Sequence, residues 1–338
     1  MPRLLISLAF LAFLLIPNTS ARGQTSIPLN VDGLNRRYLV HLPPGFDPSE
    51  NLPVMMWFHG GGGNANGGVF EADFRSLANS QRFILVYTEA WPDVVEGCRC
   101  WGYDLGQGET NGNYEIDLAY ASAVIEDLAE RYNANRSRIY AGGYSMGASF
   151  VWDLACTKSD EFAAVAPVAA SMYRSTYDNC DAGLPTAICH ILGTNDFYAP
   201  YNGASWVPPV ADQNAFWVNK NQAEPKPEVV SLGGGVTKYT WAPAEGCHGV
   251  QHFRRQGGGH DVPAFATSSI WDFVSQFDVD GLIGCGEDFL PGDLNQDGSV
   301  DSADIGLLIA AWATANADLN GDGTTDSADL GVLISNWG

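Results

Sequence analysis

The sequence predicts an α/β protein in which a mostly parallel sheet carries helices on both faces, followed by a small all-α module. Two observations predict this division. Before residue 286, short apolar runs alternate with segments of helix length, whereas beyond residue 292 two acidic stretches repeat with a period of 25 residues. A composition with 46% hydrophobic and 12% aromatic residues suits a folded core of this size.

The first 22 residues have the pattern of a secretory signal peptide. Arg3 precedes an apolar run of 13 residues at 4–16, and small residues follow at Thr19, Ser20 and Ala21. A bilayer-spanning helix needs about 20 apolar residues, so the pattern favours a cleaved signal over the alternative, an N-terminal membrane anchor. We therefore expect a secreted, extracellular protein with no membrane span.

Charge and cysteine content narrow the possible partners. The formal net charge of −22 argues against binding to nucleic acid or to an anionic membrane. Seven cysteines follow the predicted signal, and in an oxidising compartment they are expected to form disulfides rather than metal sites. Three bridges would leave one thiol over, and the spacing does not determine the pairing.

Residues 26–285 contain the strand and helix pattern of the predicted sheet. The expected strands are 36–42, 53–60, 83–90, 137–145, 163–170, 186–194, 236–242 and 251–256. The expected helices are 115–132, 146–156 and 264–277. In such sheets the functional site lies beyond the carboxyl ends of the parallel strands.

The stretch "GGYSMGAS" at 142–149 follows one of these strands and opens a helix. Its Gly143-x-Ser145-x-Gly147 pattern is that of a nucleophile elbow, a tight turn that lifts a serine hydroxyl above the edge of the sheet. A serine of this kind needs a histidine base and a carboxylate that orients the base, in the chain order serine, acid, histidine. Ser145 is thus the predicted nucleophile.

The predicted base is His260 and the predicted acid is Asp196. His260 comes directly after the last expected strand, whereas His190 and His252 fall inside strands and His248 lies in a turn, so these three are expected to be structural residues with satisfied hydrogen bonds. Asp196 follows the buried strand at 186–194, although an Asp at this place could also simply cap a turn. The other candidates are less suitable, because Asp178 and Asp181 precede that strand and Asp212 is expected in a loop.

The glycine run "WFHGGGG" at 57–63 ends an earlier strand and can supply an oxyanion hole. The backbone N–H of Gly61 is the predicted loop donor, with Gly62 as the next choice, and the N–H of Met146 is the second donor. His59 is expected to brace this loop rather than to react.

Four motifs together carry a family resemblance: "WFHGGGGN", "GGYSMGAS", "HILGTNDFYAPYNG" and "GGGHDVP". In order and spacing they resemble the secreted esterases that include polyhydroxybutyrate depolymerases and feruloyl esterases, a group with the α/β-hydrolase fold. The resemblance implies that Ser145, Asp196 and His260 are the catalytic triad and that catalysis needs no cofactor. One position differs, because the family often has an aromatic residue after GGGH, where this chain has Asp261.

The tail after a linker at 286–292 contains "DLNQDGSVDSAD" and "DLNGDGTTDSAD". Oxygen side chains at positions one, three, five, seven, nine and twelve, with glycine at six, are what a calcium loop requires. The predicted Ca²⁺ ligands are Asp293, Asn295, Asp297, Ser299, Asp301 and Asp304 in the first loop and Asp318, Asn320, Asp322, Thr324, Asp326 and Asp329 in the second. Residues 293–338 resemble paired type I dockerin repeats, which implies a structural calcium site and a cohesin-type partner on a scaffold. Calcium loops that serve only as folding staples are the alternative.

The function that the sequence predicts is a secreted serine carboxylic-ester hydrolase acting on feruloyl or acetyl esters of plant cell-wall polysaccharide. Within the enzyme class, the alternative is depolymerisation of a polyhydroxyalkanoate polyester. Outside it, the chain could be a catalytically inert cell-surface interaction protein.

Overall fold

The computed structural model describes residues 23–93, 97–106, 109–110, 113–180, 183–285, 292–295, 298–314, 317–320 and 324–337. The predicted signal peptide and most of the predicted linker lie outside the described residues.

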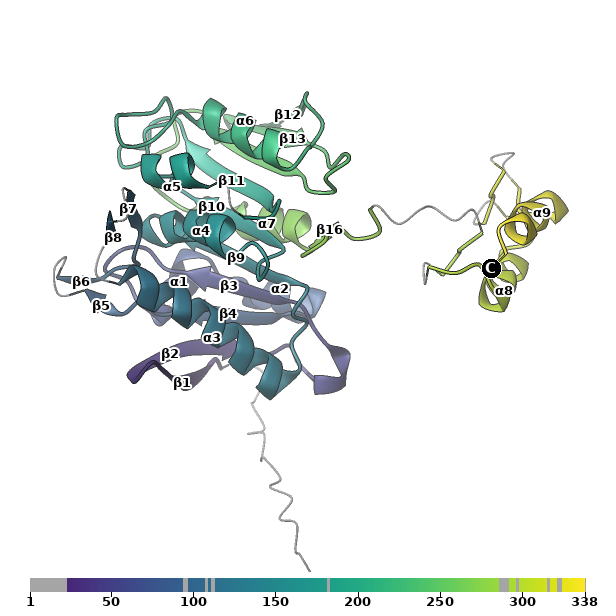
Figure 1. The fold of residues 1–338 in the computed structure, drawn as a ribbon, viewed down its shortest axis with the longest axis horizontal. Helices are drawn as coiled ribbons and strands as arrows, with labels where there is room; N and C mark the ends of the chain where they lie inside the picture. Colours follow the sequence, from purple (N-terminus) through teal and green to yellow (C-terminus); the bar gives the residue numbers. More distant parts are fainter. Residues whose placement is uncertain are drawn as a thin grey trace, which may run out of the picture.

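A ten-stranded sheet with the order β1-β2-β4-β3-β9-β10-β11-β14-β13-β12 dominates residues 23–285 of the described chain (Figure 1). Its strands are β1 (Thr25–Val31), β2 (Leu34–His41), β3 (Val54–Phe58), β4 (Ile84–Thr88), β9 (Ile139–Tyr144), β10 (Ala164–Val168), β11 (Ala187–Gly193), β12 (Glu228–Gly233), β13 (Val236–Trp241) and β14 (Val250–Arg255). The six central strands pair in parallel, and antiparallel strands extend both edges. The predicted mostly parallel sheet is therefore confirmed.

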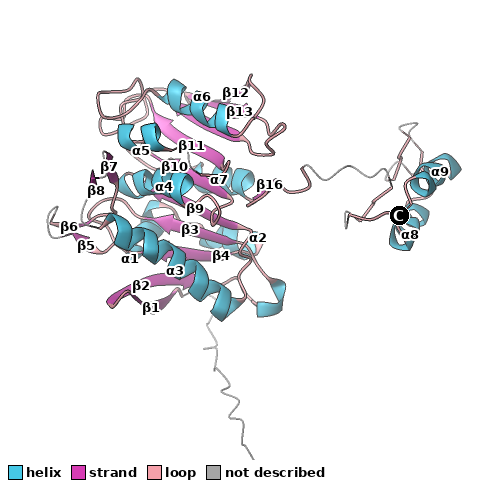
Figure 2. Cartoon of the chain, viewed as in Figure 1, coloured by secondary structure: helices cyan, strands magenta, loops and turns pink. Residues whose placement is uncertain are grey.

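Helices cover both faces of this sheet (Figure 2). They are α1 (Ala65–Glu71), α2 (Arg75–Gln81), α3 (Tyr114–Tyr132), α4 (Met146–Thr157), α5 (Arg174–Asn179), α6 (Val210–Lys220) and α7 (Ala266–Val274). Shorter elements are the 3₁₀ turn η1 (Pro48–Glu50) and the two-stranded ribbons β5 (Pro92–Asp93) with β6 (Cys98–Arg99), β7 (Asp104–Gly106) with β8 (Glu109–Thr110), and β15 (Phe277–Asp278) with β16 (Gly281–Leu282).

The core is built from strands that are buried on both sides. Along β3, Met56 and Phe58 pack with residues of α3 and α4, whereas Met55 and Trp57 pack with residues of α1, α2 and α7. Side chains of successive strand residues point to opposite faces, so a continuous apolar run fills two cores at once. This explains why the central strands have no polar alternation in the sequence.

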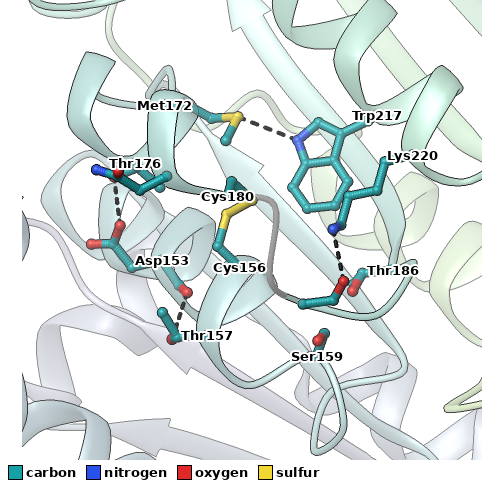
Figure 3. Close-up of a disulfide and its surroundings, with 12 residues drawn as sticks. Asp153, Cys156, Thr157, Ser159, Met172, Thr176, Cys180, Thr186, Trp217 and Lys220 are labelled. Atoms are coloured by element: carbon teal, nitrogen blue, oxygen red, sulfur yellow. Dashed lines mark hydrogen bonds between the residues drawn. A yellow bond between two sulfur atoms is a disulfide. The ribbon is translucent and has the colours of Figure 1, made fainter.

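Three disulfides join loops and helix ends around the sheet: Cys98–Cys100, Cys156–Cys180 and Cys247–Cys285. Cys189 remains free and buried in β11, as expected for seven cysteines. Figure 3 shows how Cys156, in the last turn of α4, is tied to Cys180, which caps α5. The same two helices are also joined by a hydrogen bond of 2.6 Å from Thr176 Oγ1 to Asp153 Oδ1.

Some elements were absent from the sequence prediction. The edge strands β1 and β12 and the helices α1, α2, α5 and α6 were not expected, and Asp212 lies in the first turn of α6 rather than in a loop. The unexpected helices are short or polar; α2, for example, buries only Ala78. Tertiary contacts, not a strong hydrophobic period, stabilise such segments.

The C-terminal repeats form two short helices, α8 (Ser302–Ala310) and α9 (Ser327–Ser335). Val300, Leu308 and Leu333 are buried between them and form a small separate core. Asp301 caps α8 and Asp326 caps α9 through the same capping box, so the sequence repeat is also a structural repeat.

Candidate active site

Ser145 occupies the turn between β9 and α4 with φ 54° and ψ −120°. A positive φ is unfavourable for a serine, and such strain is held only where the surrounding packing enforces it. That packing is visible at Gly147, where an added Cβ would lie 2.1 Å from the carbonyl oxygen of Phe58. Because only glycine permits this close approach, α4 begins directly against the end of β3, and the Ser145 side chain lies above the sheet edge.

His260 reaches Ser145 from the loop that follows β14. Its Nε2 lies 2.8 Å from Ser145 Oγ, and its Nδ1 lies 2.9 Å and 3.0 Å from the two carboxylate oxygens of Asp196. A carboxylate accepts the Nδ1 proton, which leaves the Nε2 lone pair facing the serine hydroxyl. The structure thus brings together all three residues that the sequence singled out as a triad.

Asp196 is itself held in a defined orientation. It is only 5% exposed, and its Oδ1 accepts backbone N–H bonds of 2.9 Å from both Tyr198 and Ala199. These two bonds show that Asp196 caps a turn, which was the alternative to a catalytic role in the sequence analysis. In the structure Asp196 caps the turn and contacts His260 at the same time.

The glycine loop after β3 lies beside Met146. A Cβ added at Gly61 would be 3.5 Å from Met146 Sδ, so the two predicted oxyanion donors are neighbours. Gly62, the second choice, already donates its N–H to the Arg99 carbonyl oxygen at 2.9 Å. Of the two glycines, Gly61 is the one whose N–H donates to no other group of the described chain.

The buried His59 and the partly buried Glu71 brace this loop. His59 Nδ1 contacts the Gly60 carbonyl at 2.7 Å, and its Nε2 accepts the Ala90 N–H at 3.1 Å. Burial lowers the pKa of His59, although the Gly60 contact opposes that shift, so the ring is a neutral brace. Glu71 accepts the Gly60 N–H at 3.0 Å, and burial raises the pKa of its carboxyl.

A cavity of about 500 Å³ opens next to Ser145 and His260. Its walls are aromatic and small side chains, among them Tyr173, Tyr198 and Trp206. Phe197 also lines the cavity and is 86% exposed. These aromatic residues are not among those predicted from the sequence, although "DFYAPY", which begins at Asp196, contains three aromatic residues directly after the predicted acid.

The remaining histidines are structural, but one expectation about them was wrong. His252 Nε2 contacts Tyr201 Oη at 2.8 Å, and its Nδ1 contacts the His190 carbonyl at 3.2 Å. His190 Nε2 donates to the Ala170 carbonyl at 3.0 Å, yet its buried Nδ1 has no hydrogen-bond partner in the described chain. His248 Nε2 is also unpartnered there. Burial lowers the pKa of His190 to about 4, so the neutral ring tolerates an unpaired lone pair.

The other acidic candidates lie away from the triad. Asp212 is exposed on α6 and Asp178 lies on α5, whereas Asp181 is outside the described residues. Asp261, the position that departs from the family pattern, forms a two-pronged ion pair with Arg255, with distances of 2.9 Å and 3.0 Å. Its carboxylate is thereby tied to the end of β14.

The predicted calcium loops repeat one hydrogen-bond pattern. The Asp304 carboxylate accepts backbone N–H bonds from Leu294, Asn295 and Asp301 at 2.7, 3.1 and 2.8 Å. The Asp329 carboxylate accepts the equivalent bonds, 25 residues further on, from Leu319, Asn320 and Asp326 at 2.7, 3.0 and 2.7 Å.

The turn at position six of the first loop also has the expected form. Gly298 adopts a φ of +84°, and its N–H donates to Asp293 Oδ2 at 2.9 Å. Asp297 and Asp322 lie outside the described residues, and the other ten predicted ligands lie within them. The described side chains offer the oxygen donors that a hard cation such as Ca²⁺ prefers, although among the described residues no group of three or more His, Cys, Asp or Glu side chains is placed to hold a metal ion.

No described helix is both long and apolar enough to cross a bilayer.

Comparison with known proteins identifies both parts of the chain. A family model described as "Putative esterase" matches residues 33–256, more than half of the chain, and the type I dockerin domain model matches residues 291–336. A bifunctional acetylxylan esterase/xylanase of Neocallimastix patriciarum is 28% identical over 74% of this chain, but the chain spans only 35% of that relative's length. Feruloyl esterase C of Emericella nidulans is 27% identical over 79% of this chain and 95% of its own length.

Among solved structures, the acetyl xylan esterase from Aspergillus awamori has a TM-score of 0.54 with 16% identity, covering 75% of this chain and 99% of its own. At this identity the likeness concerns the fold, and it agrees with the predicted α/β-hydrolase architecture. The chain therefore belongs to this esterase family and carries a C-terminal type I dockerin domain.

Proposed function

We propose that the chain is a secreted serine carboxylesterase that removes feruloyl groups, and as a second substrate class acetyl groups, from plant cell-wall polysaccharide. The observation that carries the proposal is the continuous contact from Ser145 Oγ through His260 to Asp196, at 2.8 Å and 2.9 Å, beside an aromatic cavity.

Acyl transfer follows from this geometry. His260 Nε2 takes the proton of Ser145 as Oγ attacks the ester carbonyl carbon, and the carbonyl oxygen becomes an anion. The N–H groups of Gly61 and Met146 donate to that anion, and the start of α4 adds a favourable dipole. His260 then protonates the departing alcohol oxygen, which leaves the acyl group on Ser145 Oγ. In the second half of the reaction, His260 takes a proton from a water molecule that attacks the acyl carbon, and it then returns this proton to Ser145 Oγ as the acid leaves.

The cavity favours an aromatic acyl group. Tyr173, Tyr198 and Trp206 can pack against a planar phenolic ring, and a volume of about 500 Å³ is much larger than an acetyl group requires. Relatives that are named feruloyl esterases and acetylxylan esterases support the same two acyl classes.

The location and the scaffold attachment form the second part of the proposal. Three disulfides and the signal-like N-terminus support secretion. Residues 26–285 form the hydrolase domain, and residues 293–338, joined by 286–292, form the dockerin module that binds a cohesin-type scaffold protein. Exposed apolar side chains on and beside its two helices, Leu307, Ile309, Trp312, Ile334 and Trp337, support such a docking face.

Calcium has a structural role in this module. The ligands are the twelve loop residues predicted from the sequence, and the metal offsets the repulsion between the carboxylates that each loop gathers. No catalytic step involves the ion.

One assay separates the substrate classes. The full chain is incubated with feruloylated arabinoxylan, acetylated xylan and polyhydroxybutyrate, and released ferulate, acetate and hydroxybutyrate are measured. Release of ferulate well above acetate, without hydroxybutyrate, supports the proposal. Release of hydroxybutyrate alone would favour the polyester depolymerase, and no release from any substrate or from a soluble aryl ester would favour an inert interaction protein.

A further inference from the structure

A second cavity, of about 710 Å³, lies beside α6 and the strands β13 and β14, near the β12 edge of the sheet. We call it the α6 groove and define it by Tyr201, Asn214, Asn219, Gln222, Tyr239 and Trp241, which all line it. The mechanism proposed above uses none of these residues.

Aromatic rings form a strip along the groove. The rings of Tyr239 and Trp241 are 6.1 Å apart with an interplanar angle of 21°, and the ring of Tyr239 is 6.1 Å from that of His252 at 26°. Tyr239 and Trp241 lie two residues apart on β13, so the pleat places both side chains on one face. Of these three rings, His252 is only 1% exposed, so the rings that a ligand can reach are those of Tyr239 and Trp241, which both line the groove; we call these two rings the platform.

Polar groups beside this platform are available to a ligand. Within the described chain, the side-chain amides of Asn214, Asn219 and Gln222 make no hydrogen bond, and neither does the indole N–H of Trp241. Amides can donate and accept, which suits the hydroxyl groups of a sugar.

The lining of the α6 groove carries little charge. The chain has a formal charge of −22, yet no carboxylate lines the α6 groove, and Arg254 is the one charged side chain among its lining residues in the described chain. Two aromatic rings bordered by free amides, with no carboxylate in the lining, fit an uncharged, hydroxyl-rich ligand better than a peptide or a metal ion.

The α6 groove shares a wall with the active-site cavity. Pro200 lines the active-site cavity, whereas Tyr201, the next residue, lines the groove. Burial lowers the pKa of His252 well below its ordinary range, so the ring is neutral and carries one N–H. Nδ1 must carry that proton, because it faces the His190 carbonyl oxygen. The Tyr201 hydroxyl therefore donates to His252 Nε2. The wall is therefore fixed at Tyr201 by His252 and at Tyr198 by Asp196.

We propose that the α6 groove binds a segment of an uncharged polysaccharide chain, whose sugar rings stack on Tyr239 and Trp241 while their hydroxyls bond to the three amides. C–H groups of a sugar ring contact the electron-rich face of an aromatic ring favourably. A chain held there keeps its neighbouring ester substituents close to Ser145. The choice of arabinoxylan as the polysaccharide depends on the proposed function, whereas sugar binding in the α6 groove does not depend on ester hydrolysis.

The test uses the full chain with Ser145→Ala, so that no hydrolysis occurs. The ligand is insoluble arabinoxylan from which alkali has removed all esters, so that no acyl group can occupy the active-site cavity. Depletion of protein from solution measures binding. Trp241→Ala and Tyr239→Ala should each weaken binding about fivefold to tenfold, as expected for one lost ring contact. Leu232→Ala is the matched control, because Leu232 is 51% exposed on neighbouring β12 and does not line the groove.

The same two groove substitutions in the active protein should leave turnover of a soluble aryl ester unchanged. Absence of binding by the Ser145→Ala protein, or binding that neither groove substitution weakens, would overturn the groove proposal. Failure of the proposed function gives a different result: the unsubstituted protein would bind arabinoxylan but would not turn over the soluble aryl ester.

Discussion

At the scale of single residues, the carboxylate of Asp196 caps a turn and contacts His260 at the same time. One oxygen accepts the N–H groups of Tyr198 and Ala199, and both oxygens face His260 Nδ1. The carboxylate therefore fixes the imidazole of His260. It also fixes the start of the segment 198–201, which separates the active-site cavity from the α6 groove.

Asp196→Asn should lower kcat on a soluble aryl ester by about 10³- to 10⁴-fold, because an amide can hold His260 in the wrong tautomer. Thermal unfolding of the variant checks that the fold is intact. Asp212→Asn is the control, because this carboxylate is exposed on α6 and outside both cavities. Equal activity of the Asp196→Asn and Asp212→Asn proteins would remove Asp196 from the proposed mechanism.

Where the chain order restricted the choice, the residues selected from the sequence lie together in the structure. Ser145, Asp196 and His260 each follow a parallel strand, so sheet topology alone brings them to one edge. The aromatic lining of the cavity was missed, because an exposed Phe197 or Trp206 has no fixed spacing from the triad. The unpaired nitrogen of His190 was missed as well, since burial sets it and burial is a tertiary property.

At the scale of elements, the contact between α4 and β3 positions both Ser145, the proposed nucleophile, and the glycine loop that we propose as the oxyanion hole. An added Cβ at Gly147 would lie 2.1 Å from the Phe58 carbonyl oxygen and 2.5 Å from that of His59. Both obstacles are backbone atoms, so neither can rotate away.

Gly147→Ala should push α4 away from β3, with a cost of about 1–3 kcal/mol in the free energy of unfolding. A displacement of this kind should also lower kcat about 100-fold, since Ser145 and Met146 move relative to Gly61. Denaturant unfolding and soluble-ester kinetics measure the two effects. Gly67→Ala in α1 is the control, because the nearest atom to its added Cβ is 3.8 Å away; if both variants behaved alike, the close contact would have no functional importance.

Elements with long apolar runs were predictable, and short polar ones were not. The central strands and α3 were placed to within a few residues, because burial on two faces or along one helix side leaves a strong pattern. Segments such as α2 and α6 bury few residues, and β1 and β12 lie at the sheet edges. Their formation depends on the neighbours they pair or pack with, which a local pattern does not contain.

At the scale of the whole molecule, the two parts depend on different sources of stability. Residues 23–285 bury two large apolar cores. In the described part of the dockerin domain, the buried apolar residues are only Val300, Leu308, Ala317 and Leu333. Each repeat also gathers four carboxylates in its loop sequence. A metal ion should therefore supply much of the stability of the small domain and none of that of the large one.

Removal of calcium from the full chain with a chelator should increase amide hydrogen exchange within residues 292–337 and leave soluble-ester turnover unchanged. Exchange rates localised by peptide mass measure the first effect, and readdition of Ca²⁺ should reverse it. Magnesium readdition is a useful control, since the smaller ion demands a stricter octahedral geometry. Equal protection with and without chelator would contradict a calcium-dependent fold, and activity lost with the metal would show that the two parts are coupled.

The central claim, that Ser145 is a nucleophile activated by His260, is tested most directly by covalent labelling with a fluorophosphonate. Attack of Ser145 Oγ on phosphorus expels fluoride and leaves a stable adduct, which peptide mass mapping locates. We expect one adduct per chain, on the peptide that contains Ser145, with loss of esterase activity in proportion to labelling. The His260→Ala protein should label little. An adduct at another residue, or full labelling without His260, would show that Ser145 is not a nucleophile activated by His260.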